Sequence, residues 1–101
     1  MPDALFSGIL MKEASYKAAK GLIRVRLEME DEVIKNLEIS GDFFLYPEDM
    51  LWELERFLVG KKVARKSLTA EILGFYDHFG VKSPGVEPED FANVIILASE
   101  T

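Results

Sequence analysis

Apolar and polar residues alternate without interruption in LIRVRLEME, residues 22–30. The apolar face of this segment carries four residues: Ile23, Val25, Leu27 and Met29. A period of two is typical of a half-buried strand whose other face contacts water. Asp31 and Glu32 supply a polar two-residue connection, and VIKNLEIS follows as an antiparallel return strand. We therefore predict a β-hairpin over residues 22–40.

The return strand contains one irregularity. Leu37 and Ile39 share a face, whereas Ile34 lies three positions before Leu37 and breaks the alternation. One extra residue in one strand of a pair restores such a pattern, so we expect a bulge near Lys35-Asn36.

Two segments precede the hairpin. MKEASYKAAKG, residues 11–21, suits a third strand by its pattern, and its alanine and lysine content also suits a helix. The apolar stretch from Leu5 to Met11 suits a strand or an adhesive arm and is far shorter than the roughly 18 residues that a membrane span needs. The role of residues 1–13 stays open.

Beyond Gly41 the apolar period changes from two to 3.6, which indicates helices. Pro47 suits the first position of the first helix, and Gly60 suits its end. Ser67 is a suitable N-cap for a second helix that ends at Gly80, and Pro88 opens a third. The expected apolar stripes are Met50, Leu51, Leu54, Phe57 and Leu58; Leu68, Ile72, Phe75, Tyr76 and Phe79; and Phe91, Val94, Ile95 and Ala98.

Strands first and helices second predict an α+β fold, in which about three helices pack on a three-stranded antiparallel meander. The 101 residues are expected to form a single domain, with 61–101 as its helical C-terminal part.

The amino-acid composition excludes or disfavours several classes of function. With no cysteine, thiol catalysis and cysteine-ligated metals or clusters are excluded. A net charge of −6 opposes binding to nucleic acid. The start at Met1 without a signal sequence predicts a cytoplasmic protein without membrane contact. The absence of glutamine and cysteine, beside abundant Glu and Lys, is typical of thermophilic proteins.

Most groups of chemically active residues have an ordinary structural interpretation. His78 is the only histidine, and a single histidine with scattered acids makes a poor metal site. GVKS at residues 80–83 departs from the phosphate-loop spacing and follows an expected helix. The acidic residues at 28–32 suit a solvated hairpin, and the basic run at 61–66 suits a loop between helices.

The turn between hairpin and first helix is different. Gly41 suits a positive φ, and Asp42 suits a turn or cap through its side chain. Four consecutive large apolar residues follow, from Phe43 to Tyr46, and a strand with one wet face cannot bury all of them. Either a second element covers this corner, or some of these side chains contact another protein.

Residues 16–60 resemble the small C-terminal domain of lipoate–protein ligases, and in particular the separate accessory subunit of two-chain ligases, found mainly in archaea. The resemblance, with a family-like core at 14–60, is carried by the hairpin and three short motifs: Lys17 with Lys20-Gly21, Ser40-Gly41-Asp42-Phe43-Phe44, and Pro47-Glu48.

The resemblance implies a function. Such ligases use ATP to activate lipoate as lipoyl-adenylate and then transfer it to a lysine of a lipoyl domain. The arginine- and glycine-rich signature of the catalytic domain is absent here, so no catalytic or metal-binding residue is expected on this chain. ATP, Mg²⁺ and lipoate are expected on a separate catalytic subunit, the partner in a heterodimer. The implied fold is similar to that of the iron–sulfur scaffold and sulfur-transfer families.

The resemblance also suggests which residues contact the partner: Lys17, Lys20, Gly41, Asp42, Phe43, Phe44 and Tyr46. The lysines suit either the subunit contact or the neighbourhood of the ATP phosphates. The alternative interpretation is a stand-alone interaction or scaffold domain with an unrelated partner.

Overall fold

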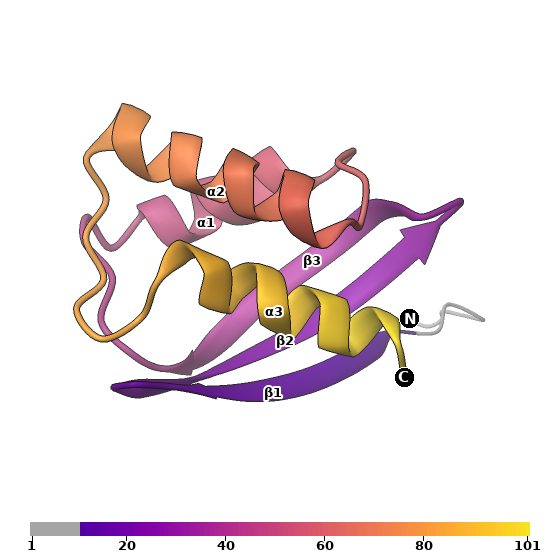
Figure 1. Ribbon diagram of the computed structural model, residues 1–101, viewed down its shortest axis with the longest axis horizontal. Coiled ribbons are helices and arrows are strands. Elements are labelled where there is room, and N and C mark those ends of the chain that lie inside the picture. The colour runs from indigo at the N-terminus through magenta and orange to yellow at the C-terminus, as the bar shows by residue number, and fades with distance from the viewer. Residues whose placement is uncertain (1–10) are drawn as a thin grey trace.

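Three antiparallel strands precede three helices in the computed structural model, which describes residues 11–101 (Figure 1). The strands are β1 (Lys12–Ala18), β2 (Gly21–Glu30) and β3 (Val33–Asp42). The helices are α1 (Met50–Leu58), α2 (Arg65–Phe79) and α3 (Pro88–Ser99). The strand order is β1-β2-β3, and the helices cover one face of the sheet. The predicted α+β meander is confirmed.

The hairpin has the predicted connection and the predicted bulge. Asp31 and Glu32 both have positive φ, 54° and 65°, as a two-residue hairpin turn requires. Asn36 lies opposite Glu28 and Ile34 lies opposite Met29, so the intervening Lys35 is the extra residue. The hairpin strands are longer than expected, because pairing continues to Gly21 and Asp42.

The segment upstream of the hairpin is a strand and not a helix. Alternate residues of β1 contact the core, with Ala14 and Tyr16 half-buried and Ala18 buried. Burial at every second position matches a strand on a sheet edge, and the pairing of β1 with β2 takes up its backbone groups.

The core lies between the inner face of the sheet and the three helices. Ile23, Val25 and Leu27 of β2 are fully buried there, opposite the predicted helix stripes. Burial of each such side chain contributes roughly 1.5–3 kcal/mol. The outer face of the sheet is charged: Arg26 lies 3.6 Å from Glu13 and 3.2 Å from Glu38, and these exposed pairs contribute little.

Two predicted helix starts are wrong. Helix α1 begins at Met50 and not at Pro47, because Tyr46 is held in extended conformation and residues 47–49 are needed to turn the chain. Helix α2 begins at Arg65, so Ser67 is no N-cap, and its hydroxyl donates to the carbonyl of Ala64 at 3.2 Å. Residues 60–63 are hydrogen-bonded to the hairpin, which sets this earlier start.

The remaining helix ends match the sequence pattern. Helix α3 starts at Pro88 with a capping box between Glu87 and Asp90, and Gly80 caps α2 with φ 64°. Helix α1 ends at Leu58, two residues before the positive-φ Gly60.

Three expectations stay predictions. The segment from Leu5 to Met11 lies outside the described residues except for Met11. The similarity to iron–sulfur scaffold and sulfur-transfer folds is not tested, and neither is the division into domains.

Within residues 11–101, no helix is long and apolar enough to cross a membrane.

Candidate functional site

Three loops meet at one end of the molecule: the β1–β2 turn, the corner at residues 43–49 and the α2–α3 loop (Figure 1). Tyr46 and Lys82 exchange two backbone hydrogen bonds, both of 2.8 Å. The N–H of Lys20 donates to the carbonyl of Gly85 at 2.9 Å. We call this end, formed by residues 18–22, 41–49 and 80–87, the loop end.

The corner is an extended segment whose side chains alternate. Phe43 packs against the core, with its ring edge-on to Phe91 at 5.6 Å between centroids, and Leu45 is buried. Phe44 and Tyr46 point outward and are 67% and 49% exposed. Their rings are parallel, with centroids 6.3 Å apart. The fold therefore covers two of the four side chains, and contact of the two exposed ones with another protein stays a prediction.

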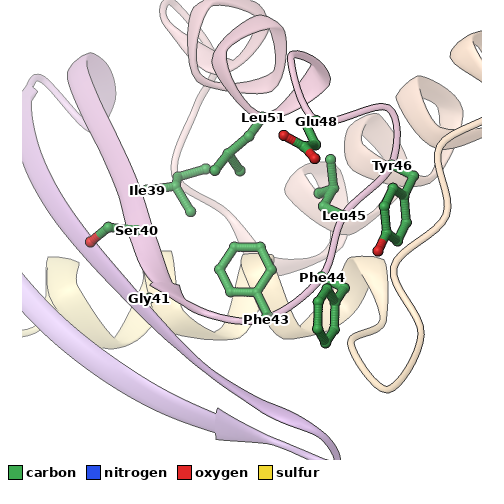
Figure 2. Close-up of a pocket in the computed structure, with 9 residues that line it drawn as sticks. All are labelled: Ile39, Ser40, Gly41, Phe43, Phe44, Leu45, Tyr46, Glu48 and Leu51. Atoms are coloured by element: carbon green, nitrogen blue, oxygen red, sulfur yellow. The ribbon is translucent and has the colours of Figure 1, made fainter.

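A hollow of about 480 Å³ lies beside the corner. The end of β3, the corner and the start of α1 curve around it (Figure 2). Its lining residues are mostly apolar: Ile39, Ser40, Gly41, Phe43, Phe44, Leu45, Tyr46, Glu48 and Leu51. Figure 2 shows the Phe43 ring lying between the strand residues and the aromatic pair Phe44 and Tyr46. Large exposed aromatics beside an apolar hollow are typical of a protein contact surface.

Gly41 allows the chain to leave the sheet in this geometry. Its φ is 136°, which confirms the positive φ predicted for this position. A Cβ atom there would lie 2.1 Å from the carbonyl oxygen of Leu22, so no other residue fits without displacing backbone. Asp42 does not form the turn; it ends β3 opposite Leu22, and the turn follows it.

A buried polar pair holds the α2–α3 loop behind the corner. The hydroxyls of Tyr76 and Ser83 are 2.7 Å apart, and Ser83 donates to the carbonyl of Val86 at 2.6 Å. Because the single proton of the Ser83 hydroxyl goes to Val86, the Tyr76 hydroxyl is the donor in the bond between Tyr76 and Ser83. Burial raises the pKa of Tyr76 to about 12, so its hydroxyl keeps its proton at neutral pH.

Glu55 connects α1 to the free edge of β3. One of its carboxylate oxygens accepts a 2.6 Å hydrogen bond from the N–H of Ile39. Loss of water around this half-buried group raises its pKa above the ordinary 4.5, and the hydrogen bond from Ile39 opposes that effect.

The structure places six of the seven predicted contact residues at the loop end, and Lys17 lies just outside it. Lys17 lies opposite Leu22, which in turn lies opposite Asp42, so this lysine is two strands away from the corner. The Lys20 side chain packs on Gly85, where a Cβ would lie 2.2 Å from that of Lys20. Lys20 therefore also has a structural role, in addition to any role in binding.

Other chemically active residues lie elsewhere. His78 is exposed beside Phe79, and Glu30 at the hairpin lies 3.5 Å from Lys35. Lys61 of the basic run lies 3.8 Å from Glu71 and covers the Phe57 ring. In the described part of the chain, no three His, Cys, Asp or Glu side chains gather as metal ligands.

Sequence reasoning missed part of the hollow. Glu48 and Leu51 line the hollow, and Lys82 holds the corner beside it, through long-range contacts that no local pattern reveals. One signal was available: the four-residue run from Phe43 can alternate with period two, which separates Phe44 and Tyr46 from the core residues.

Comparison with known proteins identifies the family. Residues 11–95 match the family described as "Bacterial lipoate protein ligase C-terminus". The chain belongs to this family. A relative, lipoate-protein ligase A subunit 2 of Thermoplasma acidophilum, is 44% identical over 86 residues, covering 85% of this chain and 88% of the relative.

A solved structure agrees with this assignment. It comes from work on an archaeal lipoylation system, a bi-partite lipoate protein ligase and its E2 lipoyl domain from Thermoplasma acidophilum. One chain superposes with a TM-score of 0.77 at 44% identity, covering 86% of our chain and 96% of its own length. The family match extends well beyond the 16–60 of the sequence resemblance, through α2 and most of α3.

The Tyr76–Ser83 pair gives a stability prediction for this ligase-family domain. Ser83→Ala leaves the buried Tyr76 hydroxyl without its acceptor and is expected to cost about 1–3 kcal/mol. Tyr76→Phe leaves Ser83 bonded to Val86 and should cost about 1 kcal/mol. Urea unfolding measures both, and a larger loss from Tyr76→Phe would contradict the assignment of Tyr76 as donor.

Glu55 gives a pH prediction. Because its pKa is raised on folding, its contribution to stability is present below the unfolded pKa near 4.5 and is lost as pH rises through the folded pKa. Glu55→Gln is neutral at every pH. The free energy of unfolding of the native chain should therefore fall relative to Glu55→Gln as the pH rises from below 4.5 through the raised folded pKa. A difference that stays constant in urea titrations over this range would contradict the raised pKa.

Proposed function

We propose that this chain is the accessory subunit of a two-chain lipoate–protein ligase, which acts with a separate catalytic subunit. The observation that carries the proposal is the 44% identity, over nearly the full length of both chains, to a protein named lipoate-protein ligase A subunit 2. That relative's name and the bi-partite ligase of the structural neighbour support a partner subunit for this chain.

The proposed reaction is carried by the catalytic subunit. There the lipoate carboxylate attacks the α-phosphorus of ATP, the bond to the β-phosphate breaks, and pyrophosphate leaves. The resulting lipoyl-adenylate then acylates a lysine of a lipoyl-domain acceptor, and AMP leaves. ATP, Mg²⁺ and lipoate bind the catalytic subunit in this account.

An accessory subunit that contacts no reacting atom acts through conformation. It promotes adenylation when it binds the adenylation-competent form of the catalytic subunit more tightly than other forms. A tenfold preference corresponds to about 1.4 kcal/mol of stabilisation of that form. We assign the contact to the loop end, because Phe44 and Tyr46 are exposed there on a backbone that is hydrogen-bonded to the α2–α3 loop at Lys82. Tyrosine and other aromatic residues are enriched in such interfaces.

The direct test is lipoyl-adenylate formation by the candidate catalytic subunit with ATP, Mg²⁺ and lipoate, with and without this chain. Pyrophosphate release reports the reaction. We expect adenylate only in the mixture. Equal adenylate without the chain, together with no co-elution of the two proteins, would refute the proposal and favour a scaffold domain with another partner.

Variants at the corner separate contact from folding. Phe44→Ala and Tyr46→Ala should each weaken the complex by about 2 kcal/mol and leave the melting temperature nearly unchanged, since both side chains are exposed. Phe43→Ala should lower stability, because its ring packs on Phe91. Leu97→Ala is the matched control: Leu97 is 42% exposed on α3, whose end lies away from the loop end. Isothermal calorimetry would contradict the assignment if Leu97→Ala weakened binding as much as Phe44→Ala.

A further inference from the structure

The outer edge of β3 is partly closed by the rest of the chain. Ile34 accepts from the N–H of Gly60 at 2.8 Å and donates to the carbonyl of Lys61 at 3.0 Å. Further along the strand, the N–H of Ile39 donates to Glu55. Residues 60–61 therefore bond to this edge at Ile34, and Glu55 of α1 bonds to it at the Ile39 amide. The backbone groups of Leu37, between these two points, have no hydrogen-bond partner outside the sheet within residues 11–101.

Past the Ile39 amide, residues 11–101 provide this edge with no further hydrogen bond. The N–H of Ile39 bonds to Glu55, so the backbone N–H and C=O of Ile39 point away from β2. In an antiparallel pair, the backbone groups of every second residue point in this direction. The carbonyl of Ile39 and both backbone groups of Gly41 accordingly face away from β2. Within residues 11–101, these three backbone groups form no hydrogen bond outside the strand ladder.

These free groups border the hollow. Ile39 and Gly41 line one side of it, Leu51 and Glu48 of the α1 region line another, and Phe43 lies between them (Figure 2). The hollow thus combines a short row of backbone donors and acceptors with an apolar surface. An extended peptide has complementary features, because it presents backbone N–H and C=O groups along its edge and side chains to the surfaces beside it.

We propose that an extended segment of the catalytic subunit adds to β3 as a fourth strand along Ile39–Gly41. This inference rests on the proposed function and specifies how the subunits meet. The segment places an apolar side chain on Phe43 and Leu51, and its flank contacts the outward rings of Phe44 and Tyr46. Among the described residues that line the hollow, Glu48 alone is charged, so the segment carries a lysine or arginine beside it.

A second copy of this chain fits the hollow poorly. Pairing of two copies would join two chains that each carry a net charge of −6, which opposes their association. A segment with a basic residue beside Glu48 has the opposite charge there.

Backbone amide exchange tests the inference directly. In the ¹⁵N-labelled free chain, the Gly41 amide should exchange rapidly, whereas Ser40, whose amide faces β2, should be protected. Addition of the unlabelled catalytic subunit should slow exchange at Gly41 by about tenfold or more, with no comparable change at Ser40.

Each alternative outcome has a separate meaning. A complex that makes lipoyl-adenylate and leaves Gly41 exchange unchanged would overturn strand addition and leave the proposed function intact. No complex and no dependence of adenylation on this chain would overturn both. Protection of Gly41 in the free chain that rises with its concentration would show a second copy in the groove, and would also overturn the inference.

A charge variant tests the basic residue. Glu48→Lys should raise the Kd for the catalytic subunit by about tenfold, because it opposes the partner's cation. Glu32→Lys makes the same change of charge at the exposed hairpin tip and should alter the Kd by about twofold at most. Equal effects of both variants would contradict a basic residue beside Glu48.

Discussion

The paired backbone hydrogen bonds between Tyr46 and Lys82 determine the shape of the loop end. They hold the corner extended after β3, and an extended chain must point successive side chains in opposite directions. Phe43 and Leu45 therefore join the core, while Phe44 and Tyr46 face solvent. The same constraint delays α1 until Met50 and leaves the hollow beside β3.

This arrangement depends on several segments that are distant in sequence. Tyr76 and Ser83 hold the α2–α3 loop, Lys20 bonds to that loop through Gly85, and Gly41 allows β3 to approach Leu22 closely. The exposed aromatics thus lie on a backbone that is restrained from three sides. A surface restrained in this way loses little conformational entropy on binding, which favours a specific contact.

Local patterns in the sequence predicted much of the fold. Alternation in β2, the broken alternation at Ile34 and the capping residues of α3 each correspond to a feature that neighbouring residues decide. The starts of α1 and α2 were predicted wrongly, because hydrogen bonds to Lys82 and to the hairpin override local helix signals at Pro47 and Ser67. The hollow could not be predicted, since Glu48 and Leu51 meet the end of β3 only after folding. The family resemblance supplied the proposed function, because no metal-ligand cluster within residues 11–101 points to one.

The central claim is that the loop end is the surface by which this chain binds its catalytic partner. The most direct measurement is a ¹H–¹⁵N spectrum of the labelled chain during titration with the unlabelled catalytic subunit. We expect the largest shift changes and line broadening at the loop end and at the adjoining Ile39 and Ser40 of β3, that is, in residues 18–22, 39–49 and 80–87. Changes concentrated instead at the hairpin tip, residues 30–34, or at the C-terminal end of α3 would contradict it.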